Sequence, residues 1–186
     1  MRIVAGSFRG RRLAAPDGEG TRPTADRVRQ ALFDRLAHAP WAESATGRSL
    51  LEGANVLDLF AGTGALGLEA MSRGAARAVF IERDRATAAV LRANVAACRV
   101  EGRCRVLVAD ALRPPNGEPC GLVFLDPPYG LDLAVPAVAA CREAGWIGPG
   151  ALLVLEIGRD KMPPPLGDAL ASFEAGAAAV YIFQTR

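Results

Sequence analysis

Short continuous runs of apolar residues recur along the chain from Asn55 onward, and segments with helical spacing separate most of them. Gly74 is placed to end the first of these helical segments, and Asp84 to cap the second. Uninterrupted apolar strands that alternate with helices predict a parallel sheet covered on both faces. The strand candidates are residues 55–60, 78–82, 105–109, 121–125, 151–156 and 178–183, and the helix candidates are 65–73, 85–98, 132–144 and a short one near 166–171.

The last strand candidate departs from this alternation. It follows residues 172–175 so closely that little room is left for the crossover helix that a parallel neighbour requires. We therefore expect the last strand to run antiparallel to the others.

The first 40 residues have a different character. Residues 1–23 are rich in glycine, arginine and proline, and Thr24 is expected to cap a helix with apolar residues on one face. Residues 40–53 are expected to form a loop. The whole pattern predicts a single domain over residues 1–186, with an N-terminal extension and helix at 1–40 and an alternating core at 54–186.

The composition is that of a globular protein, with 51% hydrophobic residues among 186. No apolar run approaches the ~20 residues of a membrane span, and the N-terminus lacks the apolar region of a signal peptide. We therefore expect a cytoplasmic protein that does not engage a membrane. The four cysteines show no C-x-x-C spacing and His38 is the only histidine, so we expect neither a metal site nor a Ser-His-Asp triad.

Positive charge is concentrated near the N-terminus. Residues 1–35 contain eight arginines and four acidic residues, a net charge of +4, whereas the rest of the chain has a net charge of −2. A basic arm on a near-neutral body is typical of a phosphate-binding element. An ordinary solvated surface is the alternative, because the chain uses arginine almost to the exclusion of lysine. The candidate nucleic-acid contacts are Arg9, Arg11, Arg12, Arg22 and Arg27.

A glycine-rich loop follows the first strand candidate. Gly62, Gly64 and Gly67 have the spacing G-x-G-x-x-G, and Glu82 ends the next strand candidate 20 residues after Gly62. This spacing fits the fingerprint of dinucleotide-binding domains. An NAD-dependent dehydrogenase is therefore a rival interpretation.

Charge favours a different ligand, S-adenosylmethionine (SAM). Ligands of open parallel sheets bind at the carboxyl ends of the strands, where this chain places Asp58, Glu82, Asp110 and Asp126. Asp58 would repel the pyrophosphate of NAD, whereas SAM carries a sulfonium and an ammonium group against one carboxylate. At an effective dielectric of ~20 and a separation of ~4 Å, each favourable pairing is worth ~4 kcal/mol before desolvation.

The loop and the carboxylates then have expected roles toward SAM. Gly62 and Gly64 let the backbone approach the methionine end of the ligand, where a side chain would collide. Glu82 can accept hydrogen bonds from both ribose hydroxyls, and Asp110 can accept one from the adenine amino group. Asp58 is expected to orient the loop or the ammonium group of the ligand.

Asp126, Pro127, Pro128 and Tyr129 form a rigid turn directly after strand candidate 121–125. The Asp126 carboxylate and the Pro127 carbonyl can accept the two hydrogens of an exocyclic amino group, which directs the nitrogen lone pair at a methyl group. Tyr129 can stack on a base taken out of its helix or loop. A purely structural turn is the alternative, and the neighbouring glycine loop favours catalysis.

Several segments together resemble the RsmD family of methyltransferases. The Asp126–Tyr129 motif alone is shared with adenine-N6 and DNA methyltransferases, and its combination with the Arg22-Pro23-Thr24 segment is what makes the resemblance specific. For Arg22 and Arg27, packing beside the ligand pocket is an open alternative to RNA contact. The resemblance is carried by residues 2–6, 9–11, 21–24, 26–29, 57–70 and 126–129.

The resemblance implies a class I SAM-dependent methyltransferase fold (Rossmann-like), with a mostly parallel seven-stranded sheet, an antiparallel last strand and a basic N-terminal extension. It implies methyl transfer from SAM to the N2 amino group of a guanine in small-subunit (16S) ribosomal RNA, with S-adenosylhomocysteine as the product and a partly assembled subunit as the substrate. A DNA or RNA adenine-N6 methyltransferase is one alternative, although 186 residues leave no room for a separate target-recognition domain. A SAM- and RNA-binding assembly factor without catalysis is another.

Overall fold

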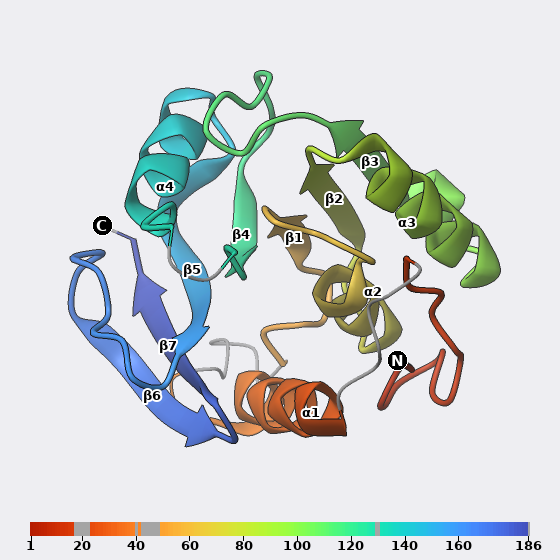
Figure 1. Cartoon of the computed structure of the whole chain (residues 1–186), viewed down its shortest axis with the longest axis horizontal. Helices are drawn as coiled ribbons and strands as arrows, with labels where there is room; N and C mark the ends of the chain where they lie inside the picture. Colours follow the sequence, from red (N-terminus) through yellow and green to blue (C-terminus); the bar gives the residue numbers. More distant parts are fainter. Residues whose placement is uncertain (17–22, 40, 42–48, 129–130, 186) are drawn as a thin grey trace.

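The structure is a computed structural model that describes residues 1–16, 23–39, 41, 49–128 and 131–185. Within these residues, seven strands form one sheet in the order β3-β2-β1-β4-β5-β7-β6 (Figure 1). The pairs β1–β2, β2–β3, β1–β4 and β4–β5 are parallel, whereas β7 is antiparallel to both β5 and β6. The strands are β1 (Asn55–Asp58), β2 (Arg77–Glu82), β3 (Cys104–Val108), β4 (Cys120–Leu125), β5 (Ile147–Gly158), β6 (Ala169–Ala175) and β7 (Ala178–Gln184). The predicted mostly parallel sheet with an antiparallel last strand is confirmed.

The prediction of a short helix near residues 166–171 is wrong. Residues 169–175 form strand β6, which pairs with β7 at the edge of the sheet. Ala171, Phe173 and Ala175 alternate with exposed residues and pack against the core. This period of two is that of a half-buried strand, which lacks the continuous apolar run that identified the central strands.

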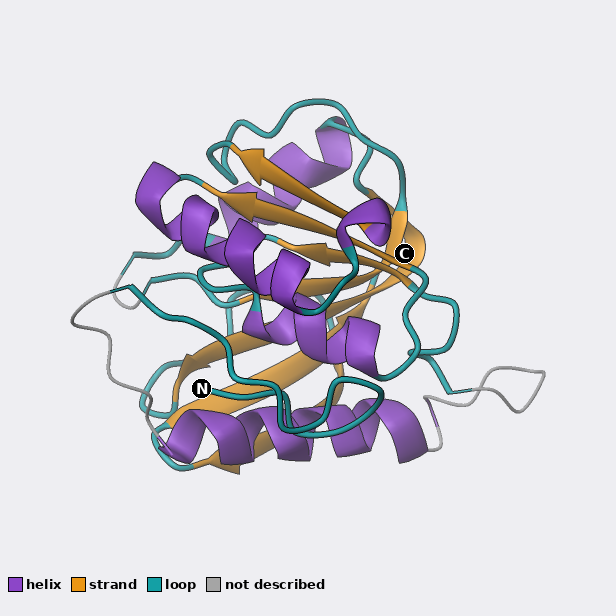
Figure 2. Ribbon diagram, turned by 90° about the vertical axis from the view of Figure 1, so that its right-hand side faces the viewer, coloured by secondary structure: helices purple, strands orange, loops and turns teal. Residues whose placement is uncertain are grey.

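Helices cover both faces of the sheet, as Figure 2 shows from the side. Residues of α1 (Pro23–His38), α2 (Ala65–Ser72) and α3 (Arg85–Ala97) pack into one buried cluster, and residues of α4 (Ala134–Glu143) pack into a second cluster on the opposite face. Helix α1 begins at Pro23, one residue before the predicted cap Thr24, at a position where proline's missing N–H is not needed. Asp84 caps α3 as predicted, because its carboxylate accepts a hydrogen bond from Thr87 N.

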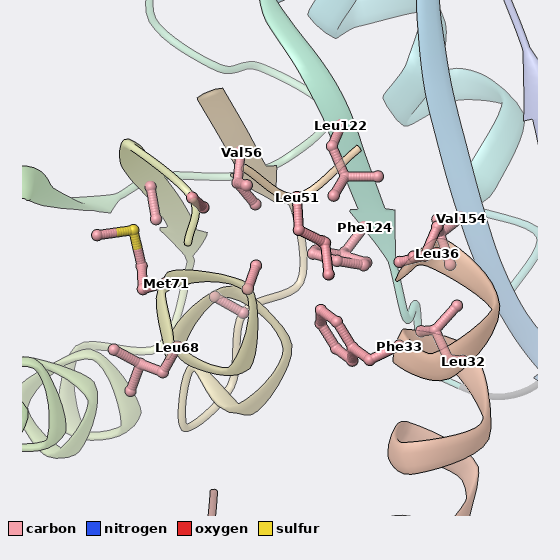
Figure 3. Packing of buried hydrophobic residues seen from close by; sticks show 14 of the residues in the cluster. Leu32, Phe33, Leu36, Leu51, Val56, Leu68, Met71, Leu122, Phe124 and Val154 are labelled. Carbon is pink, nitrogen blue, oxygen red and sulfur yellow. The ribbon is translucent and has the colours of Figure 1, made fainter. Parts of the chain in front are cut away.

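Helix α1 is fixed to the sheet by large side chains. Figure 3 shows Leu32, Phe33 and Leu36 of α1 facing Phe124 of β4 and Val154 of β5. The ring centroids of Phe33 and Phe124 lie 5.5 Å apart at a tilted angle, a favourable arrangement for an aromatic pair. This contact holds α1 across the strands whose ends carry the candidate site.

The N-terminal arm, residues 1–16, folds back on itself and docks on α2. Glu69 of α2 is fully buried, and its carboxylate accepts hydrogen bonds from Val4 N at 2.8 Å and Ala5 N at 3.0 Å. The Ser72 hydroxyl receives a hydrogen bond from Phe8 N and donates one to the Ala5 carbonyl. The arm is therefore attached to α2 through its backbone, which leaves the side chains of Arg9 and Arg12 exposed.

A second attachment joins the arm to the glycine loop. Asn94 of α3 is buried, accepts a hydrogen bond from Ala14 N and donates to the carbonyls of Ala14 and Thr63. One side chain thus satisfies backbone groups of the arm and of the loop, so the two segments are held in register.

Candidate functional site

The carboxylates predicted from the sequence gather at one edge of the sheet. Because β3, β2, β1, β4 and β5 are adjacent and parallel, their carboxyl ends meet at the same edge, where ligands of open sheets bind. In strand order the acidic residues at or just beyond the first four ends are Asp110, Glu82, Asp58 and Asp126, and Glu156 lies two residues before the end of β5.

Glu82 holds the glycine loop through its carboxylate. Gly62 N donates to Glu82 Oε2 at 2.9 Å, and Asp84 N donates to Glu82 Oε1 at 2.8 Å. Each oxygen retains a free lone pair, because a carboxylate offers about four acceptor sites. The carboxylate is therefore held in a fixed orientation and can still accept hydrogen bonds from a ligand.

The two loop glycines are required for different reasons. Gly62 has a φ of 51°, and nothing lies within 4 Å of where a Cβ would stand, which agrees with an open approach for a ligand. Gly64 has a φ of 80°, and a Cβ there would lie 2.2 Å from Leu91 Cδ1. Its positive φ and its packing against Leu91 thus favour glycine at position 64, in addition to the ligand approach expected for both glycines.

A cleft of about 540 Å³ runs along this edge of the sheet, a size typical of small-molecule sites. The residues that line it include Gly62, Glu82, Asp110, Leu112 and Asp126. Asp110 is exposed, and its Oδ1 accepts a hydrogen bond from Leu112 N at 2.9 Å. Pro127 also lines the cleft, so the structure brings five of the predicted ligand and catalytic residues together.

Asp58 lies beneath the loop. It is buried, and its Oδ2 accepts a hydrogen bond from Gly67 N at 3.0 Å. Burial raises the pKa of Asp58 to about 7; the Gly67 hydrogen bond opposes this shift and the charge of Glu82 adds to it. Asp58 reaches a smaller adjoining cavity of about 210 Å³, whose wall also contains Asp126 and Met1 of the arm.

Asp126 follows β4 and faces the open cleft, while the surrounding protein encloses its base. Desolvation raises the pKa of Asp126 well above its ordinary value, and the neighbouring charges of Glu156 and Asp58 raise it further. The adjacent Pro127 is buried and Pro128 is exposed. Tyr129, the fourth residue of the motif, lies outside the described residues.

Glu156 is an acidic residue beside the site that the sequence analysis did not single out. Leu125 of β4 pairs with Leu155 of β5, so Asp126 and Glu156 are the next residues on two neighbouring parallel strands. The signal was present, because an acidic residue follows an apolar run in both strands. It was overlooked because the run 151–156 was interpreted only as a buried strand.

Among the described residues, the predicted RNA-contacting arginines do not gather in the cleft. Arg9 and Arg12 are exposed on the arm, Arg11 donates to the Ala97 carbonyl, and Arg27 is exposed on α1. The turn of the arm contacts Ser72 at the carboxyl end of α2, whereas the cleft lies at the amino end, one eight-residue helix away or ~12 Å. Arg22 lies outside the described residues.

Arg29 differs from the other arginines of residues 1–35, because its side chain is only 4% exposed. It donates to the Arg2 carbonyl and pairs with Asp26, and its Nε lies 3.6 Å from Glu69. Arg29 is thus committed to holding the arm and does not contribute to a basic surface.

Within the described part of the chain, no group of three or more His, Cys, Asp or Glu side chains could hold a metal ion. All four cysteines are free. Among the same residues, no helix is both long and apolar enough to span a bilayer.

Comparison with known proteins gives consistent matches. The model of the family described as conserved hypothetical protein 95 matches residues 1–184. Ribosomal RNA small subunit methyltransferase D of Escherichia coli is 40% identical over 158 residues, covering 84% of this chain and 74% of that protein. The protein of the same name in Haemophilus influenzae is 36% identical and covers 87% of this chain and 80% of its own.

Solved structures agree with the sequence matches. The structure of yhhF from Escherichia coli has a TM-score of 0.80 at 37% identity and covers 100% of this chain and 97% of that chain. The 16S rRNA guanine-N2 methyltransferase RsmC of Thermus thermophilus, solved with AdoMet and guanosine, has a TM-score of 0.67 and covers 92% of this chain and 45% of that one. At 23% identity this second likeness shows the fold alone. The class I SAM-dependent methyltransferase fold predicted from the sequence is confirmed.

Proposed function

The chain belongs to the conserved hypothetical protein 95 family, the RsmD family of ribosomal RNA small subunit methyltransferases, and we propose that it transfers a methyl group from SAM to the N2 amino group of a guanine in small-subunit (16S) rRNA. The observation that carries this proposal is the position of Asp126 and Pro127, which share one cleft with Gly62, Glu82 and Asp110. Residues suited to binding SAM therefore lie next to residues suited to accepting hydrogen bonds from an amino group.

The cleft residues fit SAM in charge and in shape. Gly62 leaves open space beside the loop, and the Glu82 carboxylate is fixed by two backbone N–H groups with lone pairs to spare for ribose hydroxyls. Asp110 is exposed at the far end of the cleft, where it can accept from an adenine amino group. When bound, SAM supplies an electrophilic methyl group, and S-adenosylhomocysteine is the product.

The protein's part in the chemistry is to position and polarise the target amino group. The Asp126 carboxylate and the Pro127 carbonyl each accept a hydrogen bond from one N–H of this amino group. The nitrogen lone pair is thereby directed at the methyl group. Positive charge develops on this nitrogen as the bond forms, and the hydrogen bond to Asp126 becomes charge-assisted and about twice as strong. Tyr129 stacks on the extruded base in this proposal.

RNA is held by a surface that extends well beyond the cleft. Arg9, Arg12 and Arg27 are exposed, and together with Arg11 and Arg22 they are proposed to contact phosphates. The distance of the turn of the arm from the cleft favours a large substrate, such as a partly assembled small subunit. Because the proposed substrate is a small ribosomal subunit, we propose that the reaction takes place in the cytoplasm.

The decisive variant is Asp126→Ala, tested by single-turnover methyl transfer from labelled SAM to small-subunit particles that lack the modification. We expect the rate to fall by orders of magnitude while SAM and particle affinities change several-fold at most, because the contact strengthens only in the transition state. Glu118→Ala is the matched control, since Glu118 is an exposed acid in the loop before β4, at the opposite edge of the sheet. A near-normal rate for Asp126→Ala would favour the non-catalytic assembly factor.

The arm is tested separately by the salt dependence of particle binding. Reversing Arg9 and Arg12 to glutamate should weaken binding and reduce the slope of log K against log salt by at least ~0.7 per contact, leaving SAM affinity unchanged. Arg142→Glu on α4 is the control, because Arg142 is exposed on the other face of the sheet. An unchanged slope would return these arginines to the solvated-surface interpretation.

A further inference from the structure

Glu156 and Asp126 are neighbouring carboxylates. The proposed chemistry gives a role to Asp126 but none to Glu156. They follow the paired residues Leu155 and Leu125 on adjacent parallel strands, and such strands lie about 4.8 Å apart. Val154 and Phe124 belong to the cluster beneath α1, whereas Leu155 and Leu125 belong to the opposite cluster. By strand alternation, both acidic side chains therefore project from the same face of the sheet.

Neither carboxylate has a partner in the structure. No hydrogen bond or ion pair within the described residues reaches Asp126, which is exposed, or Glu156, which is half-buried. The oxygens of both side chains are therefore available to the donors of a ligand. The contrast with Asp58, Glu82 and Asp110 is clear, because each of those carboxylates already accepts a backbone hydrogen bond.

Glu156 lies near one positive charge and next to the catalytic turn. Burial raises its pKa, and the positive charge of Arg29 on α1 opposes that rise. Arg29 Nε has no hydrogen-bond partner within the described residues and lies 3.6 Å from Glu69, while the guanidinium group also contacts Arg2 and Asp26. Glu156 also lines a cavity of about 490 Å³ together with Pro127 and Pro128, so its surroundings are open on the side of the catalytic turn.

Two neighbouring acceptors match one nucleobase edge in particular. Guanine presents N1–H next to its N2 amino group, which makes three contiguous donor hydrogens. Adenine presents an acceptor at N1, which a carboxylate would repel. We propose that Glu156 accepts the N1–H of the target guanine while Asp126 and Pro127 hold its N2 amino group, so that Glu156 determines the choice of base. This inference rests on the proposed function and adds the residue that selects guanine.

The test uses 2-aminopurine, which keeps the 2-amino group of guanine and carries an acceptor at N1 in place of the N–H. Particles are prepared with guanine or 2-aminopurine at the methylated position, by splinted ligation of the rRNA. For the wild-type protein we expect kcat/KM to favour guanine by on the order of 10- to 100-fold, the range that one good base contact provides.

Two variants separate reading of the base from general damage. Glu156→Gln offers an amide N–H to the N1 acceptor of 2-aminopurine, so the guanine preference should fall about tenfold or reverse. Glu156→Ala should slow transfer to guanine and leave the 2-aminopurine rate at or above its wild-type value, because the carboxylate no longer faces the N1 acceptor. Glu118→Gln, a change at an exposed acid far from the cleft, should keep the wild-type ratio.

The ratio of the two substrates is insensitive to a merely structural role, because a damaged fold slows both reactions equally. An unchanged ratio in Glu156→Gln and Glu156→Ala would overturn the assignment of Glu156 while leaving the proposed function intact. Failure of the wild-type protein to methylate the guanine particle would instead overturn the proposed function itself.

Discussion

Glu69→Gln tests how the N-terminal arm is held against the catalytic core. The Glu69 carboxylate accepts hydrogen bonds from Val4 N and Ala5 N, lies 2.9 Å from Arg73 Nε and 3.6 Å from Arg29 Nε, and is fully buried. Glutamine keeps the shape but replaces one oxygen by an NH₂ group. In either amide orientation a donor then faces a backbone N–H or an arginine, and both arginines lose their shared counter-charge.

Removing one member of a buried ion network typically destabilises a protein by about 3–5 kcal/mol, a large fraction of a total stability of about 5–15 kcal/mol. With a urea m-value of about 1–3 kcal/mol/M, we expect the unfolding midpoint to fall by at least ~1 M. Glu52→Gln is the control, because Glu52 is exposed and such changes stay within about 0.5 kcal/mol. Hydrogen exchange should show that the amides of Val4 and Ala5 lose protection. A loss of less than about 1 kcal/mol with both amides still protected would refute this account of the arm.

Three further outcomes follow from the site. Glu82→Ala should weaken SAM binding by about 1–3 kcal/mol in calorimetry, because ligand hydrogen bonds to a charged acceptor are lost; tight NAD binding by the wild-type protein would contradict the cleft assignment. Since the charge-assisted contact requires an ionised Asp126, and its pKa is raised by burial and by Glu156, the single-turnover rate should fall as pH drops through that raised pKa. Glu156→Gln should shift the acid side of the pH–rate profile to lower pH. An unchanged profile would contradict the charge interaction between Glu156 and Asp126. Gly64→Ala should destabilise the protein by about 2–5 kcal/mol through its positive φ and the collision with Leu91, whereas Gly10→Ala, with the same φ and open space, should lose only about 1–2 kcal/mol in the same urea titration.

The central strands could be predicted because burial on both faces leaves an unmistakable sequence pattern. Strand β2 was expected at 78–82 and spans Arg77–Glu82, and β4 was expected at 121–125 and spans Cys120–Leu125. Edge strand β6 could not be identified in the same way. Its outer face is solvated, so its apolar residues alternate over too short a stretch to exclude a helix.

Site residues could be predicted where a local pattern in the sequence marks them. They could not be predicted where segments distant in the sequence meet. Asp58, Glu82, Asp110 and Asp126 each stand at the end of an apolar run, which marks them in the sequence. The anchoring of the arm on Glu69 joins residues more than 60 positions apart. A buried acid inside a helix carries no local signal of the backbone amides that it will accept.

The same limit explains the arginines. Charge counting treated the arginines of residues 1–35 as one basic element, yet Arg29 is buried in an ion network and Arg11 is bonded to the end of α3. Exposure depends on which helix face is buried and on how the arm folds back. Neither is encoded in the local density of positive charge.

The central claim is that this chain methylates the N2 atom of a guanine in small-subunit rRNA. The most direct measurement is transfer from isotopically labelled SAM to small-subunit particles that lack the modification, followed by nuclease digestion and mass spectrometry of the nucleosides. We predict that the label appears in N2-methylguanosine with the wild-type protein and is absent with Asp126→Ala. Label in N6-methyladenosine, or no label with the wild-type protein under conditions in which SAM binds, would contradict the claim.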